Sequence, residues 1–297
     1  MKTAVVTGGA SGIGRAVARS LIQRGVAVTV ADLNPAGSTF EDSALASTSP
    51  TSASPASTSP TSTSSASASS ASISSASVEF VKVDVTDAEA VGALMTEVKE
   101  RYGRLDFVFN NAGIAIGGTT DELTLDHWNR AIDVNLRGVV HGVHAAYPIM
   151  VEQGYGHIVN TASLAGLVPA PLMLPYTTTK HAVVGLSLAL RAEAAAHGVK
   201  VSVICPGFTD TPLLDHANPG LPATAAGTQA RSAAIRVQGK LYSVDALAAD
   251  IMRGVSRNQA VIVAPASARL AWRATRISPS ATTRIAALAV RRGFTLP

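Results

Sequence analysis

A tyrosine and a lysine one helical turn apart are the residues of this chain best suited to acid–base chemistry. Tyr176 and Lys180 are four positions apart, so on a helix they share one face. A phenol or an ammonium alone is a poor acid or base at neutral pH. A cation held beside the phenol is expected to stabilise the phenolate and so lower its pKa. Ser163 follows the strand-like residues 157–161 and can donate a hydrogen bond to a substrate oxygen.

A hydride carrier would complete this chemistry, and the N-terminus offers a loop that could bind one. A short β-branched strand at residues 4–7 runs into a glycine-rich turn, after which a helical pattern begins. The turn contains Gly8, Ser11, Gly12, Ile13 and Gly14. Glycines let the backbone approach a pyrophosphate, and a helix N-terminus favours its negative charge. Strand, glycine turn and helix in this order are typical of a dinucleotide-binding unit.

An acidic residue ends the next predicted strand, residues 26–31. Asp32 lies eighteen residues after Gly14, where a carboxylate can accept hydrogen bonds from both adenosine ribose hydroxyls and repel a 2′-phosphate. Asn34 and Pro35 follow, with no arginine or lysine close by in the sequence. We therefore expect NAD rather than NADP as the cofactor. A helix-capping role for Asp32 is the alternative.

Three more predicted strands end in small or polar residues. Ligands of open α/β sheets bind at the carboxyl ends of strands, so we expect these residues to line a binding site, with plain turns as the alternative. The strand ends carry Asp84 and Val85, then Asn111, Ala112 and Gly113, and finally Pro206, Gly207, Thr209 and Thr211.

A long helical stretch is expected over residues 125–153, and Asn135 lies inside it. An amide is neutral to unfavourable within a helix, so we expect a buried role for it, with solvent exposure as the alternative. His141 and His144 have a spacing that metal ligands could use. Because neither a cysteine motif nor a partner carboxylate accompanies them, a helix surface explains them better, and no metal site is predicted.

Composition sets the broad class of the protein. A chain of 297 residues, 47% of them hydrophobic, can bury the core of one α/β domain. The single cysteine, Cys205, excludes an intrachain disulfide and fits a reducing compartment. Residues 1–3 lead directly into a strand, which argues against a signal peptide, and no apolar run has the length of a membrane span. A cytoplasmic protein is therefore expected.

Two segments depart from this picture. Residues 43–77 are almost entirely Ser, Ala, Thr and Pro, which predicts a disordered surface insertion where a helix would normally lie. Residues 265–297 are predicted to form a basic, partly helical tail. After Asp250 the chain has eight arginines and no lysine or acid, so residues 1–250 carry a net charge of −4 and nucleic-acid binding is not indicated.

The tail contains a basic amphipathic pattern. Arg269, Arg273 and Arg276 lie on one helical stripe, and Pro279 interrupts the pattern before a second short segment. Such a pair of helices could lie on an anionic membrane surface. From the sequence alone we favour the alternative, a tail that is solvated or packs on a neighbouring subunit.

Taken in order, the motifs of residues 1–264 resemble those of the short-chain dehydrogenase/reductase family. They are TGGASGIG at 7–14, DV at 84–85, NNAG at 110–113, Asn135, Ser163, YxxxK at 176–180 and PGFTDT at 206–211. The resemblance implies a single NAD-binding catalytic domain over residues 1–264. Its expected fold is α/β, a Rossmann-type doubly wound, parallel sheet of roughly seven strands with helices on both faces. A homo-oligomer, either tetramer or dimer, is also implied.

The resemblance also implies a role for each matched residue. Tyr176 would be the general acid/base, Lys180 would bind the nicotinamide ribose, and Ser163 would orient the substrate oxygen. Asn135 would hold a helix kink and a water. The residues implied in cofactor binding are Gly8, Ser11, Gly12, Ile13, Gly14, Asp32, Asp84, Val85, Asn111, Ala112, Gly113, Tyr176, Lys180, Pro206, Gly207, Thr209 and Thr211.

The predicted function is hydride transfer between NAD and a secondary alcohol or ketone. Residues 164–174 are apolar and uncharged, which favours a lipophilic substrate unless these side chains pack into the core. Reduction of 3-oxoacyl thioesters is an alternative that usually needs NADPH, and Asp32 argues against it. A catalytically idle NAD-sensing protein is a second alternative. The intact set of Asn135, Ser163, Tyr176 and Lys180 makes that alternative weaker.

Overall fold

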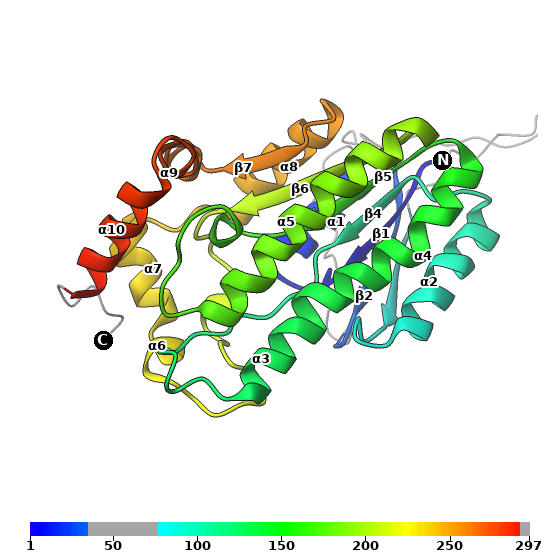
Figure 1. Ribbon diagram of the computed structural model, residues 1–297. Helices are drawn as coiled ribbons and strands as arrows, with labels where there is room; N and C mark the ends of the chain where they lie inside the picture. The colour runs from blue at the N-terminus through cyan, green and yellow to red at the C-terminus, as the bar shows by residue number, and fades with distance from the viewer. Residues whose placement is uncertain (35–76, 292–297) are drawn as a thin grey trace, which may run out of the picture.

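Parallel strands form one central sheet in the computed structural model, which describes residues 1–34 and 77–291 (Figure 1). The order of the seven strands described is β3-β2-β1-β4-β5-β6-β7, and every neighbouring pair is parallel. Their bounds are β1 Thr3–Thr7, β2 Ala27–Asp32, β3 Val78–Lys82, β4 Phe107–Asn110, β5 Gly156–Thr161, β6 Val199–Pro206 and β7 Val261–Ala264. The predicted fold class is confirmed.

The central strands are buried on both faces of the sheet. All five residues of β1 are buried, which explains why its sequence is a continuous apolar run and not an alternating one. In the register of the sheet, Val5 of β1 lies between Thr29 of β2 and Val108 of β4. The chain reverses its direction of travel across the sheet between β1 and β4, and an open α/β sheet binds its ligand at such a switch point.

Helices cover both faces of the sheet (Figure 1). On one face α1 (Gly12–Ile22) packs beside α8 (Val244–Ser256), where Leu21 and Ile251 belong to one fully buried cluster. On the other face α2 (Ala88–Tyr102) packs beside α4 (Gly138–Gln153), and α5 (Leu174–Ala194) packs on β6. Met95 and Met150 lie in the core beneath α2 and α4.

The helical stretch predicted over residues 125–153 is divided by a π-helical turn. α3 (Leu125–Ile132) leads into a π-helical segment, Asp133–Arg137, which continues into α4. π-Helical turns inside α-helices are rare and occur frequently at functional sites. This one contains Asn135.

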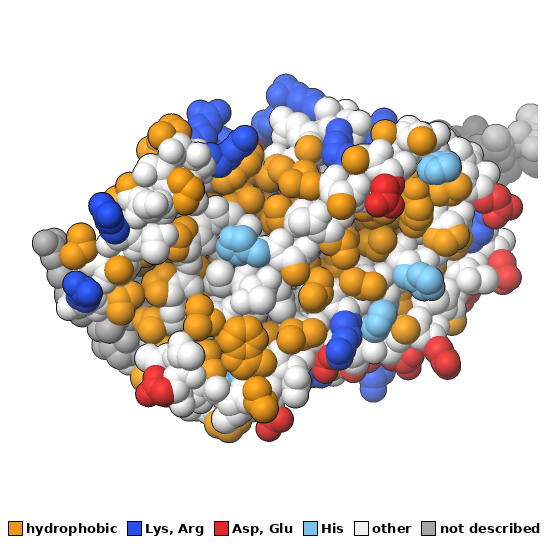
Figure 2. Space-filling model, in the orientation of Figure 1, with side chains coloured by type: hydrophobic (Ala, Val, Ile, Leu, Met, Phe, Trp, Pro, Cys, Tyr) orange, Lys and Arg blue, Asp and Glu red, His pale blue; other side chains and the backbone are white. Residues whose placement is uncertain are grey.

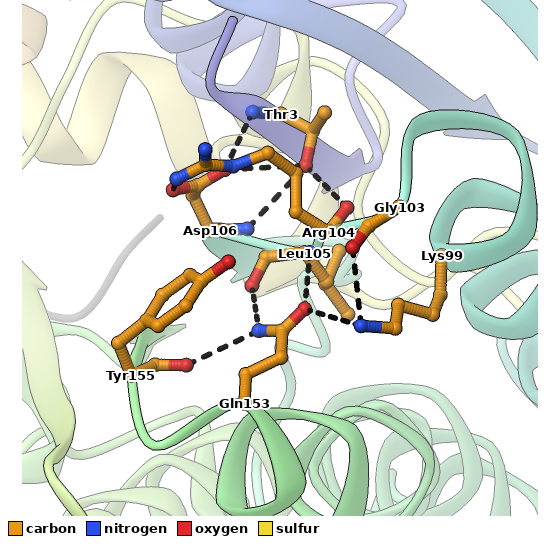
Figure 3. Close-up of polar contacts among 8 residues, drawn as sticks. All are labelled: Thr3, Lys99, Gly103, Arg104, Leu105, Asp106, Gln153 and Tyr155. Atoms are coloured by element: carbon orange, nitrogen blue, oxygen red, sulfur yellow. Dashed lines mark hydrogen bonds and ion pairs between the residues drawn. The ribbon is translucent and has the colours of Figure 1, made fainter.

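A hydrogen-bonded network lies at the amino ends of the central strands, opposite to the predicted site (Figure 3). The buried Asp106 carboxylate accepts hydrogen bonds from the Thr3 backbone nitrogen at 2.9 Å and from the Arg104 guanidinium at 2.6 and 2.7 Å. The Gln153 amide bonds both backbone groups of Leu105. These contacts tie the start of β1 to the approach to β4 and to the end of α4, so they hold the two central strands in register.

Two pairs of helices complete the described chain. α6 (Ala225–Thr228) and α7 (Ala230–Gln238) lie between β6 and α8. α9 (Ala266–Ile277) and α10 (Pro279–Ala289) follow β7 in the predicted tail. The insertion predicted at residues 43–77 falls outside the described residues, apart from Ser77. Within residues 1–34 and 77–291, every helix is too short or too polar to cross a membrane.

Candidate active site

The predicted site residues gather at the carboxyl edge of the sheet. The glycine turn follows β1, Asp32 ends β2, the Asn111 turn follows β4, Ser163 follows β5 and Gly207 follows β6. Parallel strands place all these strand ends on the same edge, which explains how residues far apart in the sequence meet. α5 completes the site because its first turns carry Tyr176 and Lys180.

Lys180 is buried beside Tyr176. The ammonium nitrogen donates a hydrogen bond to the Thr161 carbonyl oxygen at 3.0 Å and lies 5.5 Å from the centroid of the Tyr176 ring. Only 3% of Lys180 is exposed, whereas Tyr176 is partly exposed and forms a side-chain hydrogen bond with Ser163. The three predicted catalytic groups, two on α5 and one after β5, therefore lie close together.

Burial sets the pKa values of this pair. Burial raises the pKa of Tyr176, and the hydrogen bond with Ser163 opposes this shift. Burial also lowers the pKa of Lys180 to about 8, with only the nearby Cys205 thiol opposing it. The net shift of the Tyr176 pKa is therefore upward, opposite to the lowering expected from Lys180. The ammonium faces the ring of Tyr176 and bonds the Thr161 carbonyl, and a charged group without water around it is itself disfavoured.

Asn135 acts on the backbone of a neighbouring segment. Its side chain is fully buried, and its amide accepts a hydrogen bond from Ile114 N at 2.8 Å and donates one to Ile114 O at 3.0 Å. Gly113 lies next to it. A Cβ atom on Gly113 would lie 3.0 Å from Asn135 Oδ1 and 3.4 Å from Lys180 Nζ. The amide and the ammonium thus approach Gly113 together, and the buried position expected for Asn135 is observed.

The turn after β1 has the shape that a dinucleotide requires. Gly12 has φ +49°, and a Cβ atom on Gly14 would lie 2.2 Å from the Gly8 carbonyl oxygen, so neither position accepts a larger residue. Ser11 is the N-cap of α1 and forms no side-chain capping bond with any described residue. The first-turn amides of α1 therefore stay available to an anion. These features of Gly8 to Gly14 fit the pyrophosphate of a dinucleotide.

Asp32 is tied to the same turn. One carboxylate oxygen accepts from Ala10 N at 3.0 Å and the other from Asn34 N at 3.1 Å. The register of the sheet places Lys82 of β3 directly beside Asp32. Sequence proximity did not reveal this cation, because the two residues are fifty positions apart in the chain and are brought together only by strand pairing.

Asp84 and Val85 follow β3 and are held by local bonds. The Asp84 carboxylate accepts from Thr86 N at 2.9 Å and from Thr86 Oγ1 at 2.8 Å, and the bond from the Thr86 backbone lowers the pKa of Asp84. His141 Nδ1 donates to the Val85 carbonyl oxygen at 2.9 Å. His141 is therefore a link between α4 and this turn, whereas His144 is exposed, as expected for a helix surface.

The segment after β6 reaches across to the glycine turn. Thr209 and Thr211 are both buried, and the methyl group of Thr211 lies 3.3 Å from where a Cβ atom of Gly12 would stand. Arg231 of α7 fixes this segment, because its guanidinium bonds Asp210 at 2.6 Å and Asp215 at 2.6 and 2.7 Å. These ion pairs thus tie α7 to the segment that follows β6.

Three residues of the site were not identified from the sequence. The Thr7 hydroxyl accepts hydrogen bonds from the backbone nitrogens of Asn111 and Ala112, which fixes that turn beside β1. Thr161 contributes only its carbonyl oxygen, to Lys180. A Cβ atom on Gly166 would lie 2.5 Å from the Lys180 carbonyl oxygen, so this glycine lets the turn after Ser163 pack on α5. Of these three, only Thr7 could have been identified from the sequence, because it is the first residue of the glycine-rich motif at 7–14.

A separate cavity of about 400 Å³ lies between α8, β7 and α9. Arg253, Arg257, Arg269 and Trp272 are among its lining residues, and none of the predicted site residues borders it. The reactive groups at the carboxyl edge of the sheet therefore define the candidate active site, and this cavity does not.

Comparisons with known proteins agree with the geometry. The sequence model described as short chain dehydrogenase matches residues 2–47 and 56–221. The chain is 32% identical to D-beta-hydroxybutyrate dehydrogenase of Rhizobium meliloti (strain 1021), over 77% of this chain and 79% of the relative. It is 36% identical to cyclohexanol dehydrogenase of Acinetobacter sp. (strain SE19), over 72% of this chain and 75% of the relative.

The fold comparison points the same way. The crystal structure of a short chain dehydrogenase/reductase from Burkholderia phymatum in complex with NAD superposes with a TM-score of 0.71 at 30% identity, covering 92% of each chain. Levodione reductase superposes with a TM-score of 0.67 at 26% identity, over 88% of this chain and 94% of the other. The chain therefore belongs to the short-chain dehydrogenase family and is an oxidoreductase that acts on alcohol groups.

Proposed function

We propose that this protein transfers a hydride between NAD and a lipophilic secondary alcohol or ketone, with Tyr176 as the general acid/base. The observation that carries the proposal is the meeting of Tyr176, Ser163 and Lys180 beside the glycine turn of β1. Two relatives named above are dehydrogenases of D-beta-hydroxybutyrate and cyclohexanol, both of which are secondary alcohols.

Each residue of the site has a defined task in this reaction. The nicotinamide ring, when bound, accepts the hydride in oxidation and donates it in reduction. The phenol oxygen of Tyr176 takes the alcohol proton in oxidation and returns it in reduction. The Ser163 hydroxyl donates a hydrogen bond to the substrate oxygen and stabilises the charge that develops there. Asn135 keeps Gly113 and Ile114 in place between itself and Lys180.

The segment between Ser163 and Tyr176 supports a lipophilic substrate in part. Leu164 and Leu167 pack against the core, as the alternative interpretation of this segment expected. Val168, Leu172 and Met173 are partly exposed and uncharged. The Leu172 carbonyl accepts a hydrogen bond from Gly118 N at 2.8 Å, which joins this wall to the segment after β4. We infer that these three residues form the apolar wall that faces the substrate.

The preference for NAD is expected to depend on the charge of Asp32. The variant Asp32→Asn keeps an acceptor for Ala10 N but removes the negative charge that repels a 2′-phosphate. Lys82, the neighbour of Asp32 in the sheet, then attracts that phosphate. We expect the ratio of kcat/KM for NADP to kcat/KM for NAD to rise by about 10- to 100-fold, the usual range for one charged hydrogen-bonding group.

Two further variants separate the contributions of the Asp32 and Lys82 charges. Asp32→Asn combined with Lys82→Gln is expected to lose most of the gain for NADP, and Lys82→Gln alone should leave the use of NAD unchanged. Steady-state kinetics with both cofactors measure all three. An unchanged cofactor ratio in Asp32→Asn would show that this carboxylate does not select the cofactor.

A panel of substrates tests the function itself. Cyclic and linear secondary alcohols with NAD, their ketones with NADH, and 3-oxoacyl thioesters with NADPH are each followed by absorbance of the reduced cofactor. We expect turnover of lipophilic alcohols and ketones with the NAD pair. Turnover of the thioesters alone would indicate the reductase alternative. Cofactor binding without any turnover would indicate a sensor.

Two further expectations from the sequence stay predictions. They are that the protein forms a homo-oligomer and that it is located in the cytoplasm.

A further inference from the structure

The two helices after β7 present an unusual surface. α9 and α10, together called the tail helices here, belong to a stretch with no acidic residue, since Asp250 is the last acid of the chain. Arg273, Arg284 and Arg291 are exposed and form no side-chain hydrogen bond or ion pair with any described residue. Figure 2 shows basic and hydrophobic side chains, and no acidic ones, over the tail helices at the left of the view.

The inward face of α9 packs against the body of the protein. Ala268 is buried, and Trp272 packs against the core cluster that includes Val183 of α5. Arg269 donates to the Val263 carbonyl oxygen at 3.0 Å, which fixes the start of α9 on β7. On α10 the less exposed positions include Thr282 and Ala286. α9 is thus anchored to the body of the protein, and its outer face has a fixed direction.

The outward faces carry the large aliphatic residues. Leu270 is 70% exposed and Ile277 is 86% exposed, and the seven-residue spacing puts both on the side of α9 away from Ala268. On α10, Ile285 is 65% exposed and Leu288 is 49% exposed. Single exposed aliphatics are ordinary on a protein surface. Here four of them occupy the outer faces of two consecutive helices, where a surface helix usually carries charged and polar residues.

We propose that the tail helices bind the surface of an anionic lipid membrane. Leu270, Ile277, Ile285 and Leu288 insert at the boundary between headgroups and acyl chains, and the exposed arginines bind the lipid phosphates. Apolar insertion and electrostatic attraction are the two contributions that hold an interfacial helix on a membrane. The structure changes the preference drawn from the sequence, because a solvated tail would not need aliphatic residues on its outer face.

Charge argues against the tail helices of a second copy as the occupant. If the tail helices of two subunits faced each other across a two-fold axis, two surfaces without any acid would bring arginine against arginine. The aliphatic residues argue against nucleic acid, because they offer no hydrogen bonds to base edges or phosphates. An anionic lipid surface matches both parts of the patch.

Vesicle co-sedimentation of the full-length protein tests the proposal. Vesicles of phosphatidylcholine alone are compared with vesicles of phosphatidylcholine and phosphatidylglycerol at low and high salt. We expect binding to the mixed vesicles only, weakened by salt. The variant Leu270→Ser with Ile277→Ser, and the variant Arg273→Gln with Arg284→Gln and Arg291→Gln, should each reduce binding by about tenfold or more.

Matched controls use equally exposed residues elsewhere. Leu125 of α3 is 79% exposed, so Leu125→Ser removes a comparable aliphatic group. The triple variant Arg24→Gln, Arg101→Gln, Arg137→Gln removes as many exposed arginines from other parts of the chain. Both controls should bind as the wild type does. Circular dichroism and alcohol oxidation confirm that every variant is folded.

Several outcomes would overturn the proposal. One is an absence of vesicle binding by the wild type, and another is equal binding to neutral vesicles. Controls that lose binding as much as the tail variants would also overturn it. So would tail variants that change the mass measured by light scattering, or retention on duplex DNA, without changing vesicle binding. None of these results depends on the substrate, so the proposal stands or falls separately from the proposed reaction.

Discussion

Replacing Tyr176 by phenylalanine is expected to lower kcat by about 10²- to 10⁴-fold, the range of a lost general acid/base. The phenyl ring keeps its place against Lys180, whose ammonium lies 5.5 Å from the ring centroid, so the fold of α5 should not change. Only the hydroxyl group that bonds Ser163 is removed. Steady-state kinetics in both directions measure the loss, and fluorescence titration measures NAD binding, which should change by less than about threefold.

The pH dependence of the wild type gives a second measurement on the same residue. Burial raises the pKa of Tyr176, so the phenol is protonated at neutral pH in the protein as described. Oxidation needs the deprotonated form and reduction needs the protonated form. The rate of oxidation should therefore increase with pH, and the rate of reduction should fall only as the pH passes the raised pKa.

A matched control uses a tyrosine at the opposite edge of the sheet. Tyr155 is 41% exposed and lies beside Gln153, just before β5 (Figure 3). Tyr155→Phe should retain wild-type kcat. Activity of Tyr176→Phe close to that of the wild type would contradict the assignment of the acid/base. A loss of NAD binding equal to the loss of kcat would instead show that Tyr176 acts by holding the cofactor.

The variant Lys180→Met is expected to lose activity and gain stability. The ammonium is 3% exposed, and burial lowers its pKa from 10.5 to about 8, so the folded state disfavours the charge that the unfolded chain carries. The shift corresponds to about 3 kcal/mol at neutral pH. Loss of the hydrogen bond to the Thr161 carbonyl offsets about 1 kcal/mol of this. We therefore expect a gain of about 2 kcal/mol in unfolding free energy, with kcat lowered by about 10²-fold or more.

The gain should depend on pH in a defined direction. Because the folded pKa lies below the unfolded value, the unfolded chain binds more protons than the folded one between about pH 8 and 10.5. The penalty on the wild type is complete below pH 8 and disappears as the pH rises to 10.5. Urea unfolding of wild type and Lys180→Met at several pH values measures the difference, which should shrink across this range.

An exposed lysine provides the comparison for this variant. Lys200 lies on β6 with its side chain exposed. Lys200→Met should therefore change kcat, and the pH dependence of the unfolding free energy, much less than Lys180→Met does. A Lys180→Met variant that is less stable than the wild type at pH 7 would show that the Thr161 hydrogen bond outweighs burial. The lysine would then support the fold as well as the reaction.

Most of the fold could be predicted from local patterns. Buried parallel strands are rich in β-branched and apolar residues, so the strands at residues 4–7 and 26–31 could be predicted from the sequence, each within one residue of the observed β1 and β2. The π-helical turn at Asn135 could not be predicted, since its extra residue per turn is stabilised by the buried amide bonds to Ile114, twenty-one residues away.

The candidate site shows the same division between local and long-range effects. Motif residues at strand ends could be predicted to meet, because parallel strands present their carboxyl ends on one edge. The contributions of Thr161 and Gly166 could not. A backbone carbonyl leaves no trace in residue type, and the need for a glycine at 166 arises from the Lys180 carbonyl, 2.5 Å from where its Cβ would stand.

By itself, the sequence determined which residues carry the chemistry and where the polypeptide turns. Residue type and strand spacing are local properties, and they were enough to identify Tyr176, Lys180 and the glycine turn. Only the tertiary structure decided the charges around them. Strand pairing placed Lys82 beside Asp32, and burial moved the pKa of Tyr176 up and that of Lys180 down. The same is true of the tail, where packing of Ala268 turned Leu270 and Ile277 outward. The register of the strands, the burial of a charged group and the side of a helix that is exposed all depend on contacts with residues that are distant in the sequence.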